Sequence, residues 1–262
     1  MNMMLSLVAS LASAWSCTED QRVEASLEVW RTVLARARDR DIDLLLGQLR
    51  LGPIPSDLQD AKLGRVDIVE ADLSGEAEPE RIVHARFTAR LRTGPGNDRS
   101  DLVRLDRFQV LQPLGDDAFC ALGNEMSRDQ AAETWNGGPG DTMRDTWEPL
   151  TWTLTRLTRP DRETVEIVER RDVVARSVGT VTDHTFWEVD DGHLVLVLSL
   201  REFKSTCRAC GAPRQRAWFE RVGAPPQTVR QHWERCPEGA GYGDARCLSR
   251  TTEQVWSGRT YR

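Results

Sequence analysis

The chain has 262 residues, a formal net charge of -6 and 29% charged residues. This length allows one large domain or two small ones, with a core that needs no metal or disulfide to be stable. The acidic balance argues against a general nucleic-acid-binding protein, because such proteins present a basic face.

The N-terminal sequence MNMMLSLVASLASAWSC resembles a secretory signal. Its apolar stretch, Met3 to Ala14, ends in small residues and is too short to span a membrane as a helix. It lacks the Lys or Arg that usually precedes such a stretch. No later segment is apolar enough to cross a membrane. We therefore predict a signal peptide over residues 1–14, with a buried N-terminal helix as the alternative.

Two kinds of processing fit this signal. Cleavage after Ala14 would leave Trp15 first and Cys17 third in the mature chain. A lipoprotein signal would instead be cleaved before Cys17, which would then carry a lipid anchor, although the bulky Trp15 fits that pattern poorly. Either route predicts an exported bacterial protein that is periplasmic, anchored in the outer membrane or extracellular.

Residues 15–56 have a helical pattern. Thr18 is a suitable start signal, and the breaker GPIPSD follows at residues 52–57. Between them, apolar residues recur at spacings of three and four: Val23, Leu27, Trp30, Val33, Leu34 and Ala37. We predict an N-terminal helical segment over residues 15–56.

From residue 57 onward, short segments of strand character alternate with turn residues. In RIVHARFTARLR, Val83 and Phe87 point to one face and His84 to the other, which predicts a half-buried strand with one wet face. The other expected strands are LVRLDRFQVLQPLG, DAFCALG, LTWTLTRL, ETVEIVER, HTFWEV, HLVLVLSLREF, RAWFERV, TVRQHW and TEQVW.

Turn residues complete the expected fold. Asp190-Asp191-Gly192 is a hairpin signal, and the stretch from Met126 to Pro149 is a long connection that could hold a short helix. We predict an antiparallel β domain over residues 57–262 with a cysteine-containing C-terminal part. The predicted fold class is mainly β with an N-terminal helical segment, and thus α+β overall.

The stretch ADLSGEAEPERIV places oxygen-bearing side chains at intervals in an acidic loop. Asp72, Ser74, Glu76 and Glu80 are the candidate ligands of a calcium ion, because a hard cation needs several oxygens gathered by a tight loop. The alternative is an acidic turn between two strands, with Gly75 at the bend.

This loop, within residues 66–88, resembles one FG-GAP or VCBS repeat unit of integrin-like propellers, whose typical form is A-D-L-D-G-D-G-x-P-D/E-x-V. The resemblance implies a strand–loop–strand unit with calcium bound in the loop. Asp72 and Glu80 match the first and ninth positions, but Ser74, Glu76 and Ala77 depart from the third, fifth and sixth. A propeller needs several such units and this chain shows one, so we carry over the local unit alone.

Six cysteines, an even number, favour disulfides in an exported chain: Cys17, Cys120, Cys207, Cys210, Cys236 and Cys247. Zinc is an alternative for the last four, but only Cys207 and Cys210 have the usual close spacing. A redox C-x-x-C motif would need a helix after the first thiol, and strand patterns flank it instead. The last four cysteines allow three pairings, and Cys17 could pair with Cys120 unless it carries a lipid.

Recognisable catalytic patterns are missing from the sequence, so catalytic residues stay unknown. The four histidines, His84, His184, His193 and His232, have no metal-ligand spacing. A carboxylate pair for glycoside hydrolysis is conceivable among the many acidic residues, but no pair stands out. Nine tryptophans are present, and those in alternating strands are core residues by default, whereas an exposed one could stack on a sugar or a protein.

Taken together, these patterns predict an exported module that binds a protein or glycan partner or serves structurally, rather than an enzyme. Two alternatives remain: a secreted hydrolase with a carboxylate pair, and a calcium-dependent adhesion module. No cofactor is expected apart from calcium.

Overall fold

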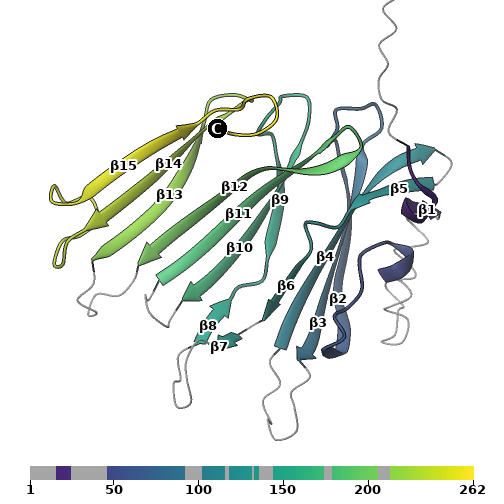
Figure 1. Cartoon of the computed structure of the whole chain (residues 1–262), viewed down its shortest axis with the longest axis horizontal. Coiled ribbons are helices and arrows are strands. Elements are labelled where there is room, and N and C mark those ends of the chain that lie inside the picture. Colours follow the sequence, from purple (N-terminus) through teal and green to yellow (C-terminus); the bar gives the residue numbers. More distant parts are fainter. Residues whose placement is uncertain are drawn as a thin grey trace, which may run out of the picture.

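The computed structural model describes residues 16–24, 46–91, 102–115, 118–131, 133–135, 144–173, 179–205 and 213–262. In these ranges the chain forms two antiparallel sheets that lie beside each other (Figure 1). The prediction of a mainly β fold with antiparallel sheets is therefore confirmed. The predicted signal peptide, residues 1–14, lies outside the described residues.

The first sheet has the strand order β1-β5-β4-β3-β2, and β6 pairs with β4 off this path. Its strands are β1 (Arg22–Glu24), β2 (Leu58–Ala71), β3 (Glu80–Leu91), β4 (Leu102–Gly115), β5 (Ala118–Gly123) and β6 (Arg128–Ala131).

The second sheet has the order β15-β14-β13-β12-β11-β10-β8-β7, and β9 pairs with β10 off this path. Its strands are β7 (Glu133–Trp135), β8 (Arg144–Trp147), β9 (Thr151–Thr155), β10 (Thr164–Val173), β11 (Gly179–Asp190), β12 (His193–Ser205), β13 (Arg214–Val222), β14 (Thr228–Cys236) and β15 (Leu248–Gln254).

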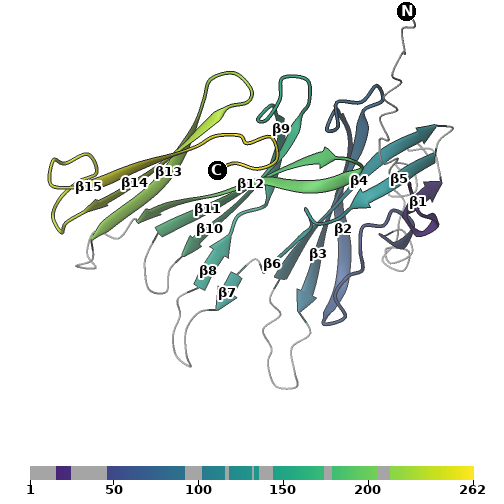
Figure 2. The ribbon, with the colours of Figure 1, turned by 45° about the horizontal axis from the view of Figure 1, so that its top comes forward.

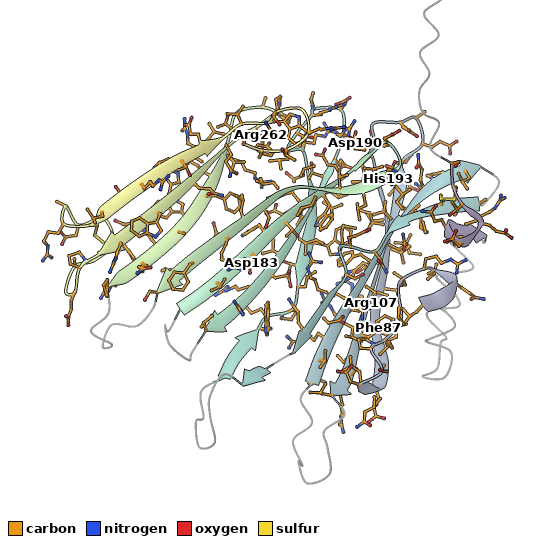
Figure 3. All side chains as sticks on the ribbon, in the orientation of Figure 1. Phe87, Arg107, Asp183, Asp190, His193 and Arg262 are labelled. Atoms are coloured by element: carbon orange, nitrogen blue, oxygen red, sulfur yellow. A yellow bond between two sulfur atoms is a disulfide. The ribbon has the colours of Figure 1, made fainter. Side chains whose placement is uncertain are left out.

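The hairpin of β11 and β12 shows how local sequence sets the register. Asp190 pairs with His193, and both are labelled at the end of the hairpin in Figure 3. The two loop residues, Asp191 and Gly192, have φ angles of 50° and 69°. Positive φ at both central residues is the requirement of the tight turn whose twist matches that of the flanking strands. The predicted hairpin is confirmed.

The N-terminal helical segment is not supported. Thr18 precedes only a short 3-10 helix, η1 (Glu19–Gln21), and the chain then enters β1, which pairs with β5 in the first sheet. Val23, expected on a helix face, instead lies in this strand and is buried in the first core. Residues 46–48 are helical, whereas residues 25–45 lie outside the described residues. Pairing along β5 decides the structure of residues 22–24, overriding the spacing of apolar residues.

The long connection from Met126 to Pro149 contains short strands in its described parts rather than a helix. β6 pairs with β4 of the first sheet, and β8 pairs with both β7 and β10 of the second. This connection therefore carries the chain from one sheet to the other (Figure 2).

Strand β3 is covered on both faces, so the predicted wet face is wrong for much of its length. One face, with Val83 and Phe87, packs in a first core together with Leu46 and other residues that precede β2. The opposite face, with Ile82, belongs to a second core that includes Val165 and other residues of the second sheet. The second sheet therefore covers a surface that alternation alone would assign to solvent.

Strands β12 and β13 lie side by side at one end and then diverge (Figures 1 and 2). Their pairing is restricted to Phe203↔Ala217 and Lys204↔Arg216. A third core connects the diverging strands; it includes Leu200 of β12, with Phe219 of β13 packed against it. This divergence opens the space in which the candidate site lies.

Candidate functional site

The acidic loop between β2 and β3 is closed by its own hydrogen bonds. An Asp72 carboxylate oxygen, Oδ1, accepts the Gly75 N–H at 2.9 Å. Glu80 is fully buried, and its Oε2 accepts the N–H groups of Leu73 at 2.9 Å and Ser74 at 3.3 Å. Two of the predicted calcium ligands therefore already have backbone partners.

The other two predicted ligands are engaged as well. The Ser74 hydroxyl accepts the Glu76 N–H at 3.2 Å, and Glu76 Oε2 accepts the Gln112 amide at 3.0 Å. Within the part of the chain that the structure describes, the carboxylates of Asp72, Glu76 and Glu80 do not gather within 4.8 Å of one another. The structure brings these residues into one loop without gathering their carboxylates around a common point.

Four of the six cysteines form two disulfides, Cys17–Cys120 and Cys236–Cys247. The disulfide interpretation is confirmed for these four residues. Glu234 lies close to the sulfurs of Cys236 and Cys247, but sulfurs joined to each other are not thiolate ligands for a metal. Cys207 and Cys210 lie outside the described residues.

A groove of about 580 Å³ lies where β12 diverges from β13. We call it the β12–β13 groove. Its lining comes from four strands: Leu200, Arg201, Ala217, Trp218, Phe219, Gln231, His232, Trp233, Arg250 and Thr252. Aromatic and basic residues are prominent in this lining, and no acidic residue takes part in it.

One end of the groove carries four exposed residues that are neighbours across β14 and β15. Trp233 lies opposite Arg250, and Arg235 lies opposite Leu248, so all four share one face of the sheet. Trp233 is 38% exposed and Leu248 is 69% exposed. Among the described residues, neither guanidinium has a hydrogen-bond or ion-pair partner. We call these four residues the Trp233 patch.

The other face of β13–β15 is different, because its charges are matched. Arg216 donates to Glu234 at 2.6 Å, and its guanidinium lies over the rings of Trp218 and Tyr242. Arg230 similarly donates to Glu253 at 2.7 Å. The unmatched positive charge of the Trp233 patch is thus a property of one face, not of these three strands in general.

A polar cluster borders the groove behind Phe219. His184 Nδ1 lies 2.9 Å from Glu166 Oε1, and Arg221 pairs with the same carboxylate at 3.4 Å. The Glu202 carboxylate approaches His184 Nε2 at 3.9 Å and also accepts the Phe219 N–H at 3.3 Å. These contacts join β10, β11, β12 and β13 beside the groove.

A second histidine cluster is enclosed between the two sheets. Trp152 of β9 donates its indole N–H to His84 Nδ1 at 3.0 Å, so the proton of a neutral ring lies on Nε2, which donates to Asp106 at 2.7 Å. Arg86 also donates to Asp106 at 2.8 Å. His84 is 2% exposed and stacks on Phe108. Histidine–carboxylate pairs serve in acid–base catalysis, but here both ring nitrogens are occupied and solvent is excluded.

The sequence missed both the groove and the histidine clusters. Trp233 reads like any other tryptophan in an alternating strand, and only the register of β14 with β15 places it beside Arg250. No local signal in the sequence marks the patch, because the residues opposite Arg250 and Arg235 follow from the strand register.

The helices among the described residues are all too short or too polar to cross a membrane. Comparison of the chain with protein-family models, with curated proteins and with solved structures found no match.

Proposed function

We propose that this protein is an exported binding module that holds its ligand in the β12–β13 groove. The observation that carries the proposal is the Trp233 patch, an exposed indole and two unpartnered guanidinium groups at the end of a groove. Aromatic and arginine side chains are the residues that dominate binding energy in interfaces. An unmatched cationic face on a chain of net charge -6 favours an anionic ligand.

The groove favours binding over hydrolysis. Glycoside hydrolysis uses two carboxylates that flank the reacting bond. The lining of the β12–β13 groove contributes none. The acidic residues that contact its lining are paired there: Asp183 with Arg201, Glu220 with His232, and Glu202 with the Phe219 N–H.

Export is supported by the disulfides Cys17–Cys120 and Cys236–Cys247, because such bonds persist in oxidising compartments. The sulfur of Cys17 is joined to Cys120 and cannot also carry a lipid thioether. We therefore favour cleavage after Ala14 over a lipid anchor. Intact-mass measurement of the protein recovered from a secreting host would show a chain starting at Trp15, and a mass matching a lipidated Cys17 would contradict this.

The binding proposal is tested by probing the purified protein against arrays of peptides and of glycans. We expect binding that is lost with Trp233→Ala or Arg250→Ala and retained with Arg259→Ala, which removes an exposed arginine from the C-terminal turn outside the groove lining. If no ligand on either array binds, or if all three variants bind alike, the groove is not the functional site.

A further inference from the structure

A small residue forms part of the floor of the β12–β13 groove. Ala217 lies in one row between Phe203 and Trp233 of the two neighbouring strands, and residues that pair directly share a face of the sheet. The Phe203 ring is turned toward β11, because a Cβ added at Gly179 would lie 2.9 Å from it. Phe203 and Trp233 stand two strand spacings apart, about 10 Å, so the Ala217 methyl group leaves a slot beside the indole.

The Trp233 indole is open to a ligand. Trp233 is 38% exposed, and in the described part of the chain it makes no ring-stacking or cation–π contact. Trp218, on the opposite face of the sheet, is instead stacked on His232 and lies under the Arg216 guanidinium. An exposed indole without such a partner is available to a ring that enters the groove.

Neutral hydrogen-bonding groups lie beside the indole. Gln231 and Thr252 pair with each other, and they lie one row along from Trp233 and Arg250 on the same face. Both line the groove, and neither side chain has a hydrogen-bond partner among the described residues. An amide and a hydroxyl can each donate and accept, so this part of the wall suits a ligand with hydroxyl groups.

Free positive charge is confined to the Trp233 side of the groove. Arg250 lies directly opposite Trp233 and has an unpartnered guanidinium, and Arg235 follows Trp233 on the same face of β14. On the other side of the groove, Arg201 donates to Asp183 (labelled in Figure 3) at 2.5 and 3.2 Å. A carboxylate matches the planar guanidinium with two parallel hydrogen bonds, so the ligand should carry one near Arg250.

The main chain of this face is already paired. Ala217 pairs with both Phe203 and Trp233, and Trp233 also pairs with Arg250. A ligand on this face is therefore contacted by side chains, and a peptide there would find no main-chain partners for its own amide and carbonyl groups. A sugar instead presents hydroxyl groups and an apolar ring face, which match the amide, hydroxyl and indole groups of the groove.

We propose that the ligand of the β12–β13 groove is an acidic oligosaccharide. One sugar ring lies over Ala217 against the Trp233 indole. Its carboxylate pairs with Arg250, and its hydroxyl groups bond to Gln231 and Thr252. The groove volume of about 580 Å³ is within the range of small-ligand sites, about 300–1,000 Å³. This assignment rests on the proposed binding function and adds the class of ligand.

The experiment measures binding to the purified full-length protein by isothermal titration calorimetry. The probes are oligosaccharides that contain uronic acids: oligogalacturonates, alginate oligosaccharides and hyaluronan oligosaccharides. Two controls separate charge from sugar. Methyl esters of the same oligosaccharides keep the rings but remove the charge of the carboxylates, whereas oligoglutamate keeps carboxylates without sugar rings.

We expect at least one of the uronate probes to bind, its methyl ester to bind at least tenfold more weakly, and oligoglutamate not to bind. Trp233→Ala and Arg250→Gln should each weaken binding tenfold or more. Ala217→Leu should do the same without a change of charge, because the larger side chain fills the slot. Arg259→Gln removes an exposed charge outside the groove and should bind as the unaltered protein does. Circular dichroism checks that every variant is folded.

Four results would overturn the assignment. Equal binding of oligoglutamate, with the same dependence on Arg250, would show a site for carboxylates in general and leave the proposed binding function standing. Equal binding of the methyl esters would show a site for neutral glycans. Uronate binding that is unchanged by Trp233→Ala and Arg250→Gln would place the sugar elsewhere on the protein. If no uronate binds, the acidic oligosaccharide is excluded; the array experiment above then decides whether the groove binds another ligand or none.

Discussion

Trp152 is the residue through which the second sheet reaches the buried His84 cluster of the first. Its indole N–H satisfies one ring nitrogen of His84, and Asp106 satisfies the other. A buried polar group costs free energy unless it is hydrogen-bonded, so the cluster is stable only when the two sheets are correctly docked.

Replacing Trp152 with Phe should lower the free energy of unfolding by about 1–3 kcal/mol, because it leaves His84 Nδ1 buried without a donor. Urea denaturation followed by circular dichroism measures the change. The same substitution at the exposed Trp233 is the control, with an expected effect within about 0.5 kcal/mol. Equal losses at the two positions would contradict a role for the hydrogen bond.

Glu188 makes stability depend on pH. Burial raises the pKa of its carboxyl above the ordinary value of 4.5, although Thr158 and Thr164 both donate to it at 2.6 Å. The folded state therefore binds this proton more tightly than the unfolded chain does. The stability that the group contributes is full below the unfolded-state pKa and is lost as pH rises through the folded-state pKa.

We accordingly expect Glu188→Gln to gain stability relative to the unaltered protein as pH rises from about 4.5 toward neutrality. Urea midpoints measured over this pH range test the trend. Glu78→Gln, which neutralises an exposed carboxylate, is the control. A difference between Glu188→Gln and the unaltered protein that stays constant with pH would show that Glu188 is not the titrating group.

At the scale of elements, the acidic loop between β2 and β3 acts as a link between the sheets. The Asp72 carbonyl accepts the Glu163 N–H at 2.5 Å, while the Asp72 N–H donates to the Glu163 carboxylate at 3.0 Å. The Leu73 carbonyl also accepts the N–H of Val189 in β11. These contacts explain the shape of the loop without an ion.

We expect the melting temperature to be the same in millimolar calcium as in excess chelator, because Asp72, Glu76 and Glu80 are already hydrogen-bonded within the protein. Differential scanning fluorimetry is sufficient for the test, with magnesium as the control for ionic effects. A calcium-specific rise of several degrees would establish the loop as a binding site, since an ion that binds only the folded state stabilises it.

Strands and their turns were the elements that the sequence predicted best. Alternation in β3 and the Asp191-Gly192 turn are local signals, and both led to the right element. The prediction that one face of β3 is exposed to solvent was wrong. Alternation shows that the two faces of a strand differ, but it does not show whether a second sheet covers the polar face. The short strand β1 was missed because its partner, β5, lies far along the chain.

At the scale of the molecule, the two disulfides close loops of very different size. Cys17–Cys120 spans 103 residues and ties the N-terminal segment to the first sheet, whereas Cys236–Cys247 spans 11 residues at the end of β14. The β12–β13 groove likewise depends on long-range geometry, because it exists only where two strands stop pairing. Such features are set by the assembled sheets, so the sequence alone could not predict the site.

Replacing both members of a disulfide with Ala should cost more stability for the long loop than for the short one. The loop-closure relation gives about 4.7 kcal/mol for Cys17–Cys120 and about 2.8 kcal/mol for Cys236–Cys247. Urea denaturation of the two double variants measures the order. A larger loss for the short loop would show that the Cys17–Cys120 bond does not stabilise the protein mainly by restricting the unfolded chain.

The pairing of β1 with β5 also sets a schedule for folding during synthesis. Cys17 and the nearby strand β1 are made early. Neither the Cys17 sulfur nor β1 has its partner until Cys120 and the rest of β5 have been made. At about 5–20 residues per second, that interval lasts roughly 5–20 seconds for a span of 103 residues. Throughout this time the first sheet lacks its β1 edge, and the Cys17 thiol can exchange with any disulfide that it meets.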